Sequence, residues 1–364
     1  MSYCGENNFF SFRDGYCETL PGTTLTSAAA SQFGRIISRF FLRFSVGCDG
    51  FGYNHILYAL CCGISEGGKD AYVCENTDLS SFLFGYPLIS SDCGIYVSNT
   101  GGSVKISVFN GKRFPVSDKL LTQILNSEPI EPAKKSGKLI SSGSFRDIYI
   151  NNIADSLDNT LSAISAGVSC GNYSTRSLWL EFFTGSDDNL VFQISDDGRK
   201  VNAYSSEHGF ISYDKLVLAF THLPKNSGKT IFLPEDFHYG VDSIMADRNI
   251  EIIRFNPEEN IPDKVANQRF LWDPLYMCTH LTSDRNTFLK MIKEIPSIVS
   301  VRREVTTLFP EKIYEKRCIM EKEGRILISQ SGKNRAFLTV QSFKTETASE
   351  ICGRWTDKIQ KSDF

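Results

Sequence analysis

The hydrophobic positions in the first third of the chain alternate between helical spacing and short strand-like runs. Helical spacing covers residues 25–42 and 55–64, and apolar runs typical of strands cover residues 44–47 and 70–74. This is the order of a β-α-β unit. Such crossovers predict a mixed or mainly parallel sheet with helices on both faces and ligand-binding loops at the carboxyl ends of the strands.

Two polar segments interrupt the hydrophobic pattern. Residues 128–137 contain two prolines and neighbouring like charges, and residues 224–228 form a second break. A strand at 230–233, a helix at 236–247 and a strand at 250–255 then predict another β-α-β unit. We therefore expect four domains, at residues 1–133, 138–225, 228–304 and 305–364.

The last predicted domain has a different pattern. Strands are expected at residues 325–328 and 336–342, followed by a helix. The apolar stripe of this helix consists of Ala348, Ile351, Trp355 and Ile359. The predicted fold class is α/β, with three α/β units containing mixed sheets and a small C-terminal α+β domain.

Composition narrows the range of partners. The 364 residues carry a formal net charge of −3 without a long basic block, which argues against nucleic acid as a partner. No uninterrupted apolar stretch of about 18–20 residues predicts a membrane span, and the N-terminus lacks a leader pattern, so we expect a cytoplasmic protein. The 11 cysteines show no metal-ligand spacing and are interpreted as reduced, mostly buried thiols.

Short motifs occur along nearly the whole chain in an informative order. They are F-R-D-G at 12–15, V-G-C-D at 46–49, C-G-I-Y-V-S-N-T at 93–100, V-F-N-G at 108–111 and G-R-I-L-I-S-Q-S-G at 324–332. Their order and spacing resemble those of the α-D-phosphohexomutase family, which comprises phosphoglucomutases, phosphomannomutases and phosphoglucosamine mutases. The resemblance implies a phosphohexomutase-like fold, a phosphosugar ligand, a phosphoserine donor and Mg²⁺ held by three carboxylates.

The position of the phosphoserine is altered in this chain. An alignment without gaps places Thr100 there, and a shifted alignment places Ser98 there; residues 101–103 replace the family's H-N-P. The lysine that follows in the family falls on Ser107, or on Lys105 with a shift of two residues. Either Ser98 or Thr100 is a candidate nucleophile, and the alternative is an ordinary turn between two strands.

The metal-binding loop is altered as well. If Arg199 is the family's arginine, Asp196 keeps one carboxylate, whereas Ile194 and Gly198 occupy the other two positions. Mg²⁺ needs several oxygen ligands, so Asp196 alone is a poor metal site, and a polar turn is the alternative. The resemblance therefore implies no cofactor here, and Mg²⁺ only if the chain is an active mutase.

Phosphate-binding arginines of the family are replaced by Cys17, Cys48 and Phe51. The C-terminal loop is the exception, because its side chains and backbone can still form an anion site. The candidate phosphate-binding residues are Ser331, Gly332, Lys333 and Arg335. The alternative for this loop is a solvated, charged turn.

The sequence between residues 256 and 273 also lacks the G-E-x-S-G sugar loop of the family. This absence and the substitutions favour a protein that keeps the fold and has lost mutase activity. Its partners would be a phosphosugar, an active mutase or another enzyme, or a second copy of itself. The alternative is an active, divergent, Mg²⁺-dependent phosphosugar mutase. At least two of Phe40, Phe41 and Phe44 are expected to be buried in the first domain.

Overall fold

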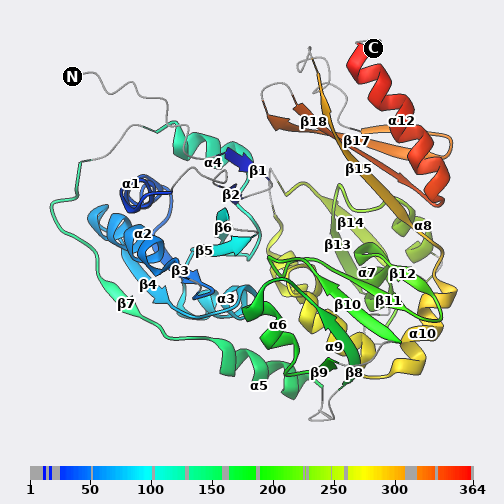
Figure 1. Ribbon diagram of the computed structural model, residues 1–364, viewed down its shortest axis with the longest axis horizontal. Coiled ribbons are helices and arrows are strands. Elements are labelled where there is room, and N and C mark those ends of the chain that lie inside the picture. The colour runs from blue at the N-terminus through cyan, green and yellow to red at the C-terminus, as the bar shows by residue number, and fades with distance from the viewer. Residues whose placement is uncertain are drawn as a thin grey trace. The chain divides into compact units, whose positions relative to one another are not determined.

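The computed structural model divides the chain into two compact units (Figure 1). Unit 1 contains residues 1–207 and 256–283, and unit 2 contains residues 208–255 and 284–364. The residues that the structure describes are 11–13, 16–18, 25–50, 52–100, 103–127, 131–157, 164–185, 189–223, 226, 229–246, 248–257, 261–307, 318–332 and 335–361.

The first sheet of unit 1 has the strand order β1-β2-β6-β5-β3-β4-β7. Strands β5, β3, β4 and β7 run parallel, whereas β1, β2 and β6 are joined by antiparallel pairings. The predicted mixed sheet is therefore confirmed. Its strands are β1 (Ser11–Arg13), β2 (Tyr16–Glu18), β3 (Arg43–Cys48), β4 (Asp70–Cys74), β5 (Cys93–Thr100), β6 (Ser103–Asn110) and β7 (Leu139–Ser141).

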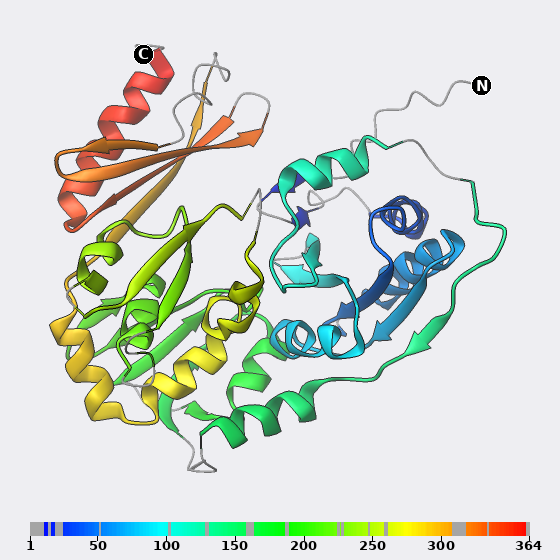
Figure 2. The same ribbon diagram turned by 180° about the vertical axis from the view of Figure 1, so that it is seen from behind.

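Helices cover both faces of this sheet, as the two ribbon views show (Figures 1 and 2). One core packs the sheet against α1, α2 and α4, whereas Phe82 of α3 contacts the opposite face at Gly47. The helices of this region are α1 (Ser27–Ile37), α2 (Asn54–Glu66), α3 (Leu79–Gly85), the 3-10 helix η1 (Tyr86–Ile89) and α4 (Asp118–Leu125).

Helix α1 begins where the Thr26 hydroxyl accepts a hydrogen bond from the Ala29 amide at 3.1 Å. Helix α1 packs closely on α2 because α2 has a glycine, Gly63, where the two helices touch. A Cβ on Gly63 would lie only 1.9 Å from the Ser31 carbonyl oxygen of α1. The expected helix through residue 42 is too long, since α1 ends at Ile37 and a turn leads into β3. The helix must end early enough for the chain to reverse into the sheet.

The three aromatic residues after α1 differ in burial. Phe44 is completely buried, whereas Phe40 and Phe41 are partly buried and pack against the same core. The Phe41 ring meets the Phe44 ring edge-on, with centroids 6.1 Å apart. The expectation of at least two buried rings is therefore wrong, because only Phe44 is buried and Phe40 and Phe41 lie at the margin of the core.

The remainder of unit 1 contains a smaller sheet with β8 between β10 and β9, and with β11 next to β10. Residues 256–283 belong to the same unit. Its elements are α5 (Arg146–Ser156), β8 (Ile164–Ser169), α6 (Tyr173–Trp179), β9 (Phe183–Gly185), β10 (Leu190–Ile194), β11 (Val201–Ser205), η3 (Asp263–Asn267), η4 (Arg269–Leu271) and α9 (Pro274–Thr282).

Unit 2 contains the predicted second β-α-β unit and the C-terminal α+β domain. Strands β13 and β14 pair in parallel, and the second sheet has the order β15-β18-β17-β16. The elements are β12 (Gly209–Ile211), α7 (Tyr213–Thr221), β13 (Thr230–Pro234), α8 (Gly240–Ala246), β14 (Glu251–Phe255), α10 (Arg285–Glu294), β15 (Val299–Thr306), β16 (Cys318–Glu321), β17 (Gly324–Gly332), β18 (Arg335–Ser342) and α12 (Thr345–Lys361).

The C-terminal helix α12 packs along one face of the four-stranded sheet (Figure 1). The predicted stripe is confirmed, because Ala348, Ile351, Trp355 and Ile359 are all buried in this core. The opposite face of the sheet contacts the loop after β13: Arg325 Nε donates to Gln341 Oε1 at 2.9 Å, and the Gln341 amide donates to the Asp236 carbonyl at 2.6 Å. The sheet and the second β-α-β unit are thereby joined.

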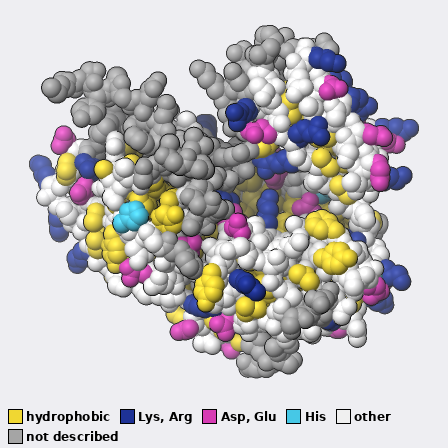
Figure 3. Space-filling view, in the orientation of Figure 1, with side chains coloured by type: hydrophobic (Ala, Val, Ile, Leu, Met, Phe, Trp, Pro, Cys, Tyr) yellow, Lys and Arg dark blue, Asp and Glu magenta, His cyan; other side chains and the backbone are white. Residues whose placement is uncertain are grey.

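Among the described residues, no helix is long and apolar enough to cross a bilayer. Figure 3 shows basic and acidic side chains interspersed over one face of the molecule. The described cysteines are free thiols. The buried rings of His222 and His280 form hydrogen bonds with backbone carbonyls at 2.7 and 2.8 Å, so both have a structural role.

Candidate functional site

The β5–β6 hairpin places Ser98 directly opposite Lys105. Both residues are buried, with 4% and 7% of their surfaces exposed. Directly paired residues on neighbouring strands point to the same face, so the hydroxyl and the ammonium group share one side of the hairpin. Thr100 ends β5 opposite Ser103, and its side chain lies outside the described residues.

Lys105 leaves the hairpin to reach the loop between β10 and β11. Its Nζ lies 3.2 Å from Oδ2 of Asp197, and Arg199 Nε lies 3.0 Å from the same oxygen. The other oxygen, Oδ1, accepts the Ser195 hydroxyl at 2.6 Å and the Arg199 amide at 3.2 Å. One carboxylate therefore receives four hydrogen bonds, two of them from cationic side chains.

This arrangement fixes the charge of Asp197. Burial by itself raises the pKa of the carboxyl group, but Arg199, Lys105 and the Ser195 hydroxyl lower it more, so the pKa lies well below its usual range. Asp197 remains ionised at any physiological pH. Its negative charge is balanced by two side chains of the same chain.

Asp196, the predicted metal ligand, has different surroundings. Its Oδ1 lies next to the backbone of Gly171, only 2.5 Å from the place that a Cβ would occupy there. Gly198, which ends the turn, has a φ of +69°. The described residues contain no group of three His, Cys, Asp or Glu side chains that could hold a metal ion. Neighbouring carboxylates that face different partners do not form the oxygen shell that Mg²⁺ requires.

We predict that Mg²⁺ does not bind this loop with micromolar affinity. Asp197 has no oxygen left without a hydrogen bond, and Asp196 would have to bind the ion without its neighbour. In isothermal titration calorimetry, Mg²⁺ injected into the wild type or into Asp196→Ala should give the same heats as Mg²⁺ injected into buffer. Micromolar binding that is lost in Asp196→Ala would contradict this prediction.

The two alternative positions of the lysine have different surroundings. Ser107 pairs with Tyr96 in the hairpin and is 3% exposed, whereas Lys105 reaches Asp197. Sequence reasoning did not single out Asp197. The signal was present in its spacing, two residues after Ser195 and two before Arg199, because short polar side chains at this distance commonly bond within one turn.

The replaced arginine positions contain no charge where the structure describes them. Cys48 is fully buried, and its thiol donates to Asn54 Oδ1 at 3.2 Å. Burial raises the pKa of this thiol, so it stays neutral. Cys17 lies in β2 without a described side chain, and Phe51 lies outside the described residues.

The candidate phosphate-binding loop connects β17 to β18. Gly332 pairs with Arg335, which is exposed. Lys333 lies outside the described residues, and Ser331 lies in β17 without a described side chain. Because the even-numbered residues Ala336 and Leu338 face α12, Arg335 and Phe337 face the opposite side. Arg302 of the neighbouring strand stacks on Phe337, its Cζ 3.8 Å from the ring centre.

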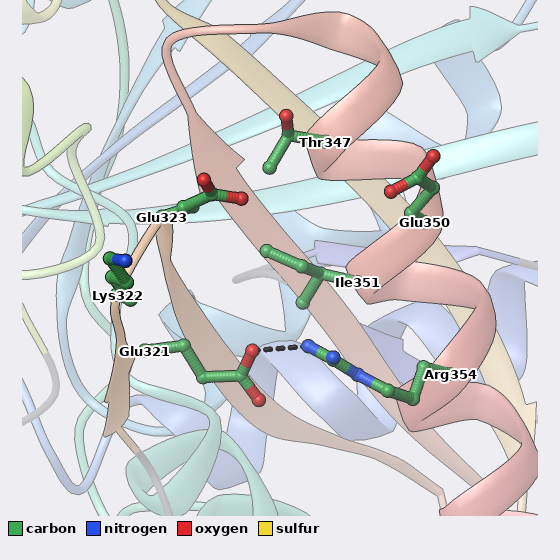
Figure 4. A pocket seen from close by; sticks show the side chains of 7 residues that line it. All are labelled: Glu321, Lys322, Glu323, Thr347, Glu350, Ile351 and Arg354. Atoms are coloured by element: carbon green, nitrogen blue, oxygen red, sulfur yellow. Dashed lines mark hydrogen bonds and ion pairs between the residues drawn. The ribbon is translucent and has the colours of Figure 1, made fainter.

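A hollow of about 430 Å³ lies on the other side of this sheet, between the β16–β17 turn and α12 (Figure 4). Glu321 faces Arg354 across it, and the second oxygen of Glu321 accepts the Trp355 indole N–H at 2.7 Å. The central acidic group is thus already paired. We interpret this hollow as a structural junction between helix and sheet.

Comparison with known proteins supports the predicted fold. The sequence matches no model of a protein family and no curated protein. A solved phosphoglucomutase/phosphomannomutase family protein from Burkholderia thailandensis is 15% identical, with a TM-score of 0.69 over 95% of this chain and 96% of that one.

A protein from Thermus thermophilus, provisionally described as a phosphomannomutase, is 12% identical with a TM-score of 0.67 over 94% of this chain and 97% of that one. An N-acetylglucosamine-phosphate mutase of the α-D-phosphohexomutase superfamily is 9% identical, with a TM-score of 0.52 over 97% of each chain. The predicted phosphohexomutase-like fold is thereby confirmed.

Proposed function

We propose that this chain binds sugar phosphates without interconverting them and serves as a binding or regulatory partner of an enzyme in carbohydrate or cell-envelope metabolism. The observation that carries the proposal is the Asp197 carboxylate. Lys105 and Arg199 neutralise it directly, in the loop where the family resemblance implies a metal ion. A divalent cation stabilises the charge that develops during phosphoryl transfer, and these residues leave no carboxylate pair to hold one.

The surroundings of Ser98 also support the loss of phosphoryl transfer. A phosphoserine carries a charge of about −1.5 to −2 and three acceptor oxygens that need solvent or cationic partners. Ser98 is 4% exposed, and the cation opposite it is already paired with Asp197. Nearby, Cys48 supplies a neutral thiol where the family has an arginine. A phosphoryl group on Ser98 would therefore be buried without sufficient positive charge.

We expect the purified protein to show no mutase turnover. The assay contains Mg²⁺, a hexose 1,6-bisphosphate and, in turn, the 1-phosphates of glucose, mannose, glucosamine and N-acetylglucosamine, with an active phosphohexomutase as the positive control. Formation of any 6-phosphate above background would overturn the proposal, and its loss in Ser98→Ala or in Thr100→Ala would identify the nucleophile. That result would establish the alternative, an active and divergent mutase.

Phosphate binding is expected at the β17–β18 loop. Arg335 and Arg302 both lie on the sheet face away from α12. A third cation, Lys333, precedes Arg335 by two residues in the sequence. In the resembled family the matching loop grips the phosphate that is not transferred, a role that needs affinity but no catalysis. A protein without phosphoryl transfer can therefore keep it.

We predict that glucose 6-phosphate binds with a dissociation constant of about 1 mM, or about −4 kcal/mol, and more weakly at high salt. The double variant Lys333→Ala, Arg335→Ala should weaken binding at least tenfold, because it removes two charge-assisted contacts. Lys290→Ala, Lys293→Ala removes the same charge from the exposed side of α10 and is the matched control. Chemical-shift titration that gives equal affinities for both double variants would exclude this loop.

A further inference from the structure

A second polar cavity in unit 1, of about 260 Å³, has no role in the site described above. It lies where the parallel strands β3 and β4 end, beside α5 and α6. The carboxyl ends of parallel strands are a frequent location of ligand sites. The volume is below the roughly 300–1,000 Å³ typical of pockets for drug-sized ligands, so it suits a molecule of monosaccharide size.

Two loops of unusual backbone conformation form one wall of the cavity. Gly50 has a φ of +81° and Asn76 a φ of +51°, a region that non-glycine residues rarely adopt. The Asn76 amide oxygen lies 2.2 Å from the place that a Cβ on Gly50 would occupy. A side chain at position 50 would therefore displace the Asn76 amide. Such conformations persist where the surrounding structure holds polar groups in fixed positions.

The charges around the cavity disfavour an anion. Asp49 lines the cavity, is 5% exposed and accepts a hydrogen bond from the Asn172 amide at 3.1 Å. Arg146, the lining cation, is bonded to Glu181 at 3.1 Å and to the Ser177 hydroxyl at 3.1 Å. The carboxylates of Asp49 and Glu181 outnumber the single guanidinium, so a phosphate would meet net negative charge.

The lining instead offers hydrogen-bonding groups suited to hydroxyls and one aromatic ring. Asp49 can accept, Asn76 and Ser177 can both donate and accept, and the Tyr173 side chain is 70% exposed at the rim. A pyranose has hydroxyl groups around its edge and an apolar C–H face that packs on an aromatic ring. We infer that this cavity binds an unphosphorylated hexopyranose, with the sugar stacked on Tyr173 and hydrogen-bonded to Asp49 and Asn76.

The test is saturation-transfer difference NMR with glucose, mannose and N-acetylglucosamine as probes. At least one sugar should bind the wild type with millimolar affinity and show its strongest signals at ring C–H protons. Tyr173→Ala should weaken binding at least tenfold. Tyr204→Ala, which removes a half-exposed tyrosine from β11 of the same unit, is the control and should bind like the wild type.

Gly50→Ala supplies a second, independent variant, because it displaces the Asn76 amide without removing a polar group. It should also weaken binding, and its circular dichroism spectrum shows whether the fold is retained. The inference is overturned if none of the three sugars binds, if binding is indifferent to Tyr173→Ala, or if glucose 6-phosphate displaces the bound sugar from this cavity. The Lys333→Ala, Arg335→Ala variant should keep hexose binding, which separates this site from the proposed phosphate loop.

Discussion

Replacing Asp273 with alanine is expected to lower the free energy of unfolding by about 3–5 kcal/mol. Asp273 is completely buried at the start of α9. Its Oδ2 accepts Arg269 Nε at 2.7 Å, and its Oδ1 accepts the Tyr149 hydroxyl at 2.7 Å and the Tyr276 amide at 3.1 Å. Removal of this carboxylate leaves a largely buried cation and a completely buried hydroxyl without their acceptor.

The surroundings of Arg269 make this loss severe. The guanidinium lies between aromatic rings, 4.4 Å from the ring centre of Tyr276 and 5.0 Å from that of Phe84. These rings attract a cation but cannot replace the charge of a carboxylate. Arg269 Nη2 is already buried without a hydrogen-bond partner. Among the residues that the structure describes, Arg269 forms an ion pair only with Asp273, and its Nη1 donates to the uncharged Asn152 amide.

Asp284→Ala is the matched control, because Asp284 caps α10 in the same way but is exposed. Loss of an exposed N-cap costs about 1 kcal/mol. Denaturant unfolding followed by circular dichroism should therefore separate the two variants by at least about 2 kcal/mol. Equal destabilisation would show that the ion pair with Arg269 adds nothing to the cap.

Acidification is expected to destabilise unit 2 through His238. The ring is completely buried; its Nδ1 accepts the Gly240 amide at 3.1 Å, and its Nε2 therefore donates to the Ser342 carbonyl at 3.1 Å. Burial, helped by the nearby Arg325 and Arg254, lowers the pKa of His238 from 6.5 to about 4. The folded ring is neutral, and a proton on Nδ1 would break the bond to Gly240.

The direction of the pH effect on stability depends on whether the folded or the unfolded chain binds the proton more tightly. Between pH 6.5 and about 4 the unfolded chain binds a proton at His238 and the folded chain does not, so the free energy of unfolding falls as pH falls. The full effect is about 3 kcal/mol, at about 1.4 kcal/mol per pH unit, and it is absent above pH 6.5. Denaturant unfolding at pH 4.5 and 7 measures the difference.

His238→Asn keeps an acceptor for the Gly240 amide and cannot be protonated, so it should flatten the pH dependence of stability. His55→Asn removes an exposed histidine of α2 and is the control, expected to follow the wild type. If wild type and His238→Asn lose stability in parallel between pH 7 and 4.5, His238 is not the group responsible.

Local patterns in the sequence predicted much of the fold. The stripe of α12 and the β13-α8-β14 unit depend on side chains that are close in sequence, so helical and strand periodicity was sufficient to find them. The end of α1 was predicted five residues too late, because Phe40 continues the apolar spacing although it lies in the turn before β3. Periodicity cannot tell a helix from a turn that packs on the same core.

The candidate site was less predictable because it depends on pairing between distant segments. The pairing of Lys105 with Ser98 depends on the register of the β5–β6 hairpin, and Asp197, the ion-pair partner of Lys105, lies 92 residues away. The bond between Tyr149 and Asp273 joins residues 124 positions apart. Spacing within a motif contains no information about such long-range contacts, and Asp196 was singled out only by its position before Arg199 in the resembled motif.

The discontinuity of unit 1 has a consequence for how the protein emerges from the ribosome. Residues 1–207 are made first, but residues 256–283 belong to the same compact unit. At about 5–20 residues per second, synthesis of residues 208–283 takes about 4–15 s. During that interval Tyr149 lacks the Asp273 carboxylate and the aromatic pocket around it lacks Arg269. The nascent chain thus presents an incomplete apolar surface, which is the kind of surface that chaperones bind.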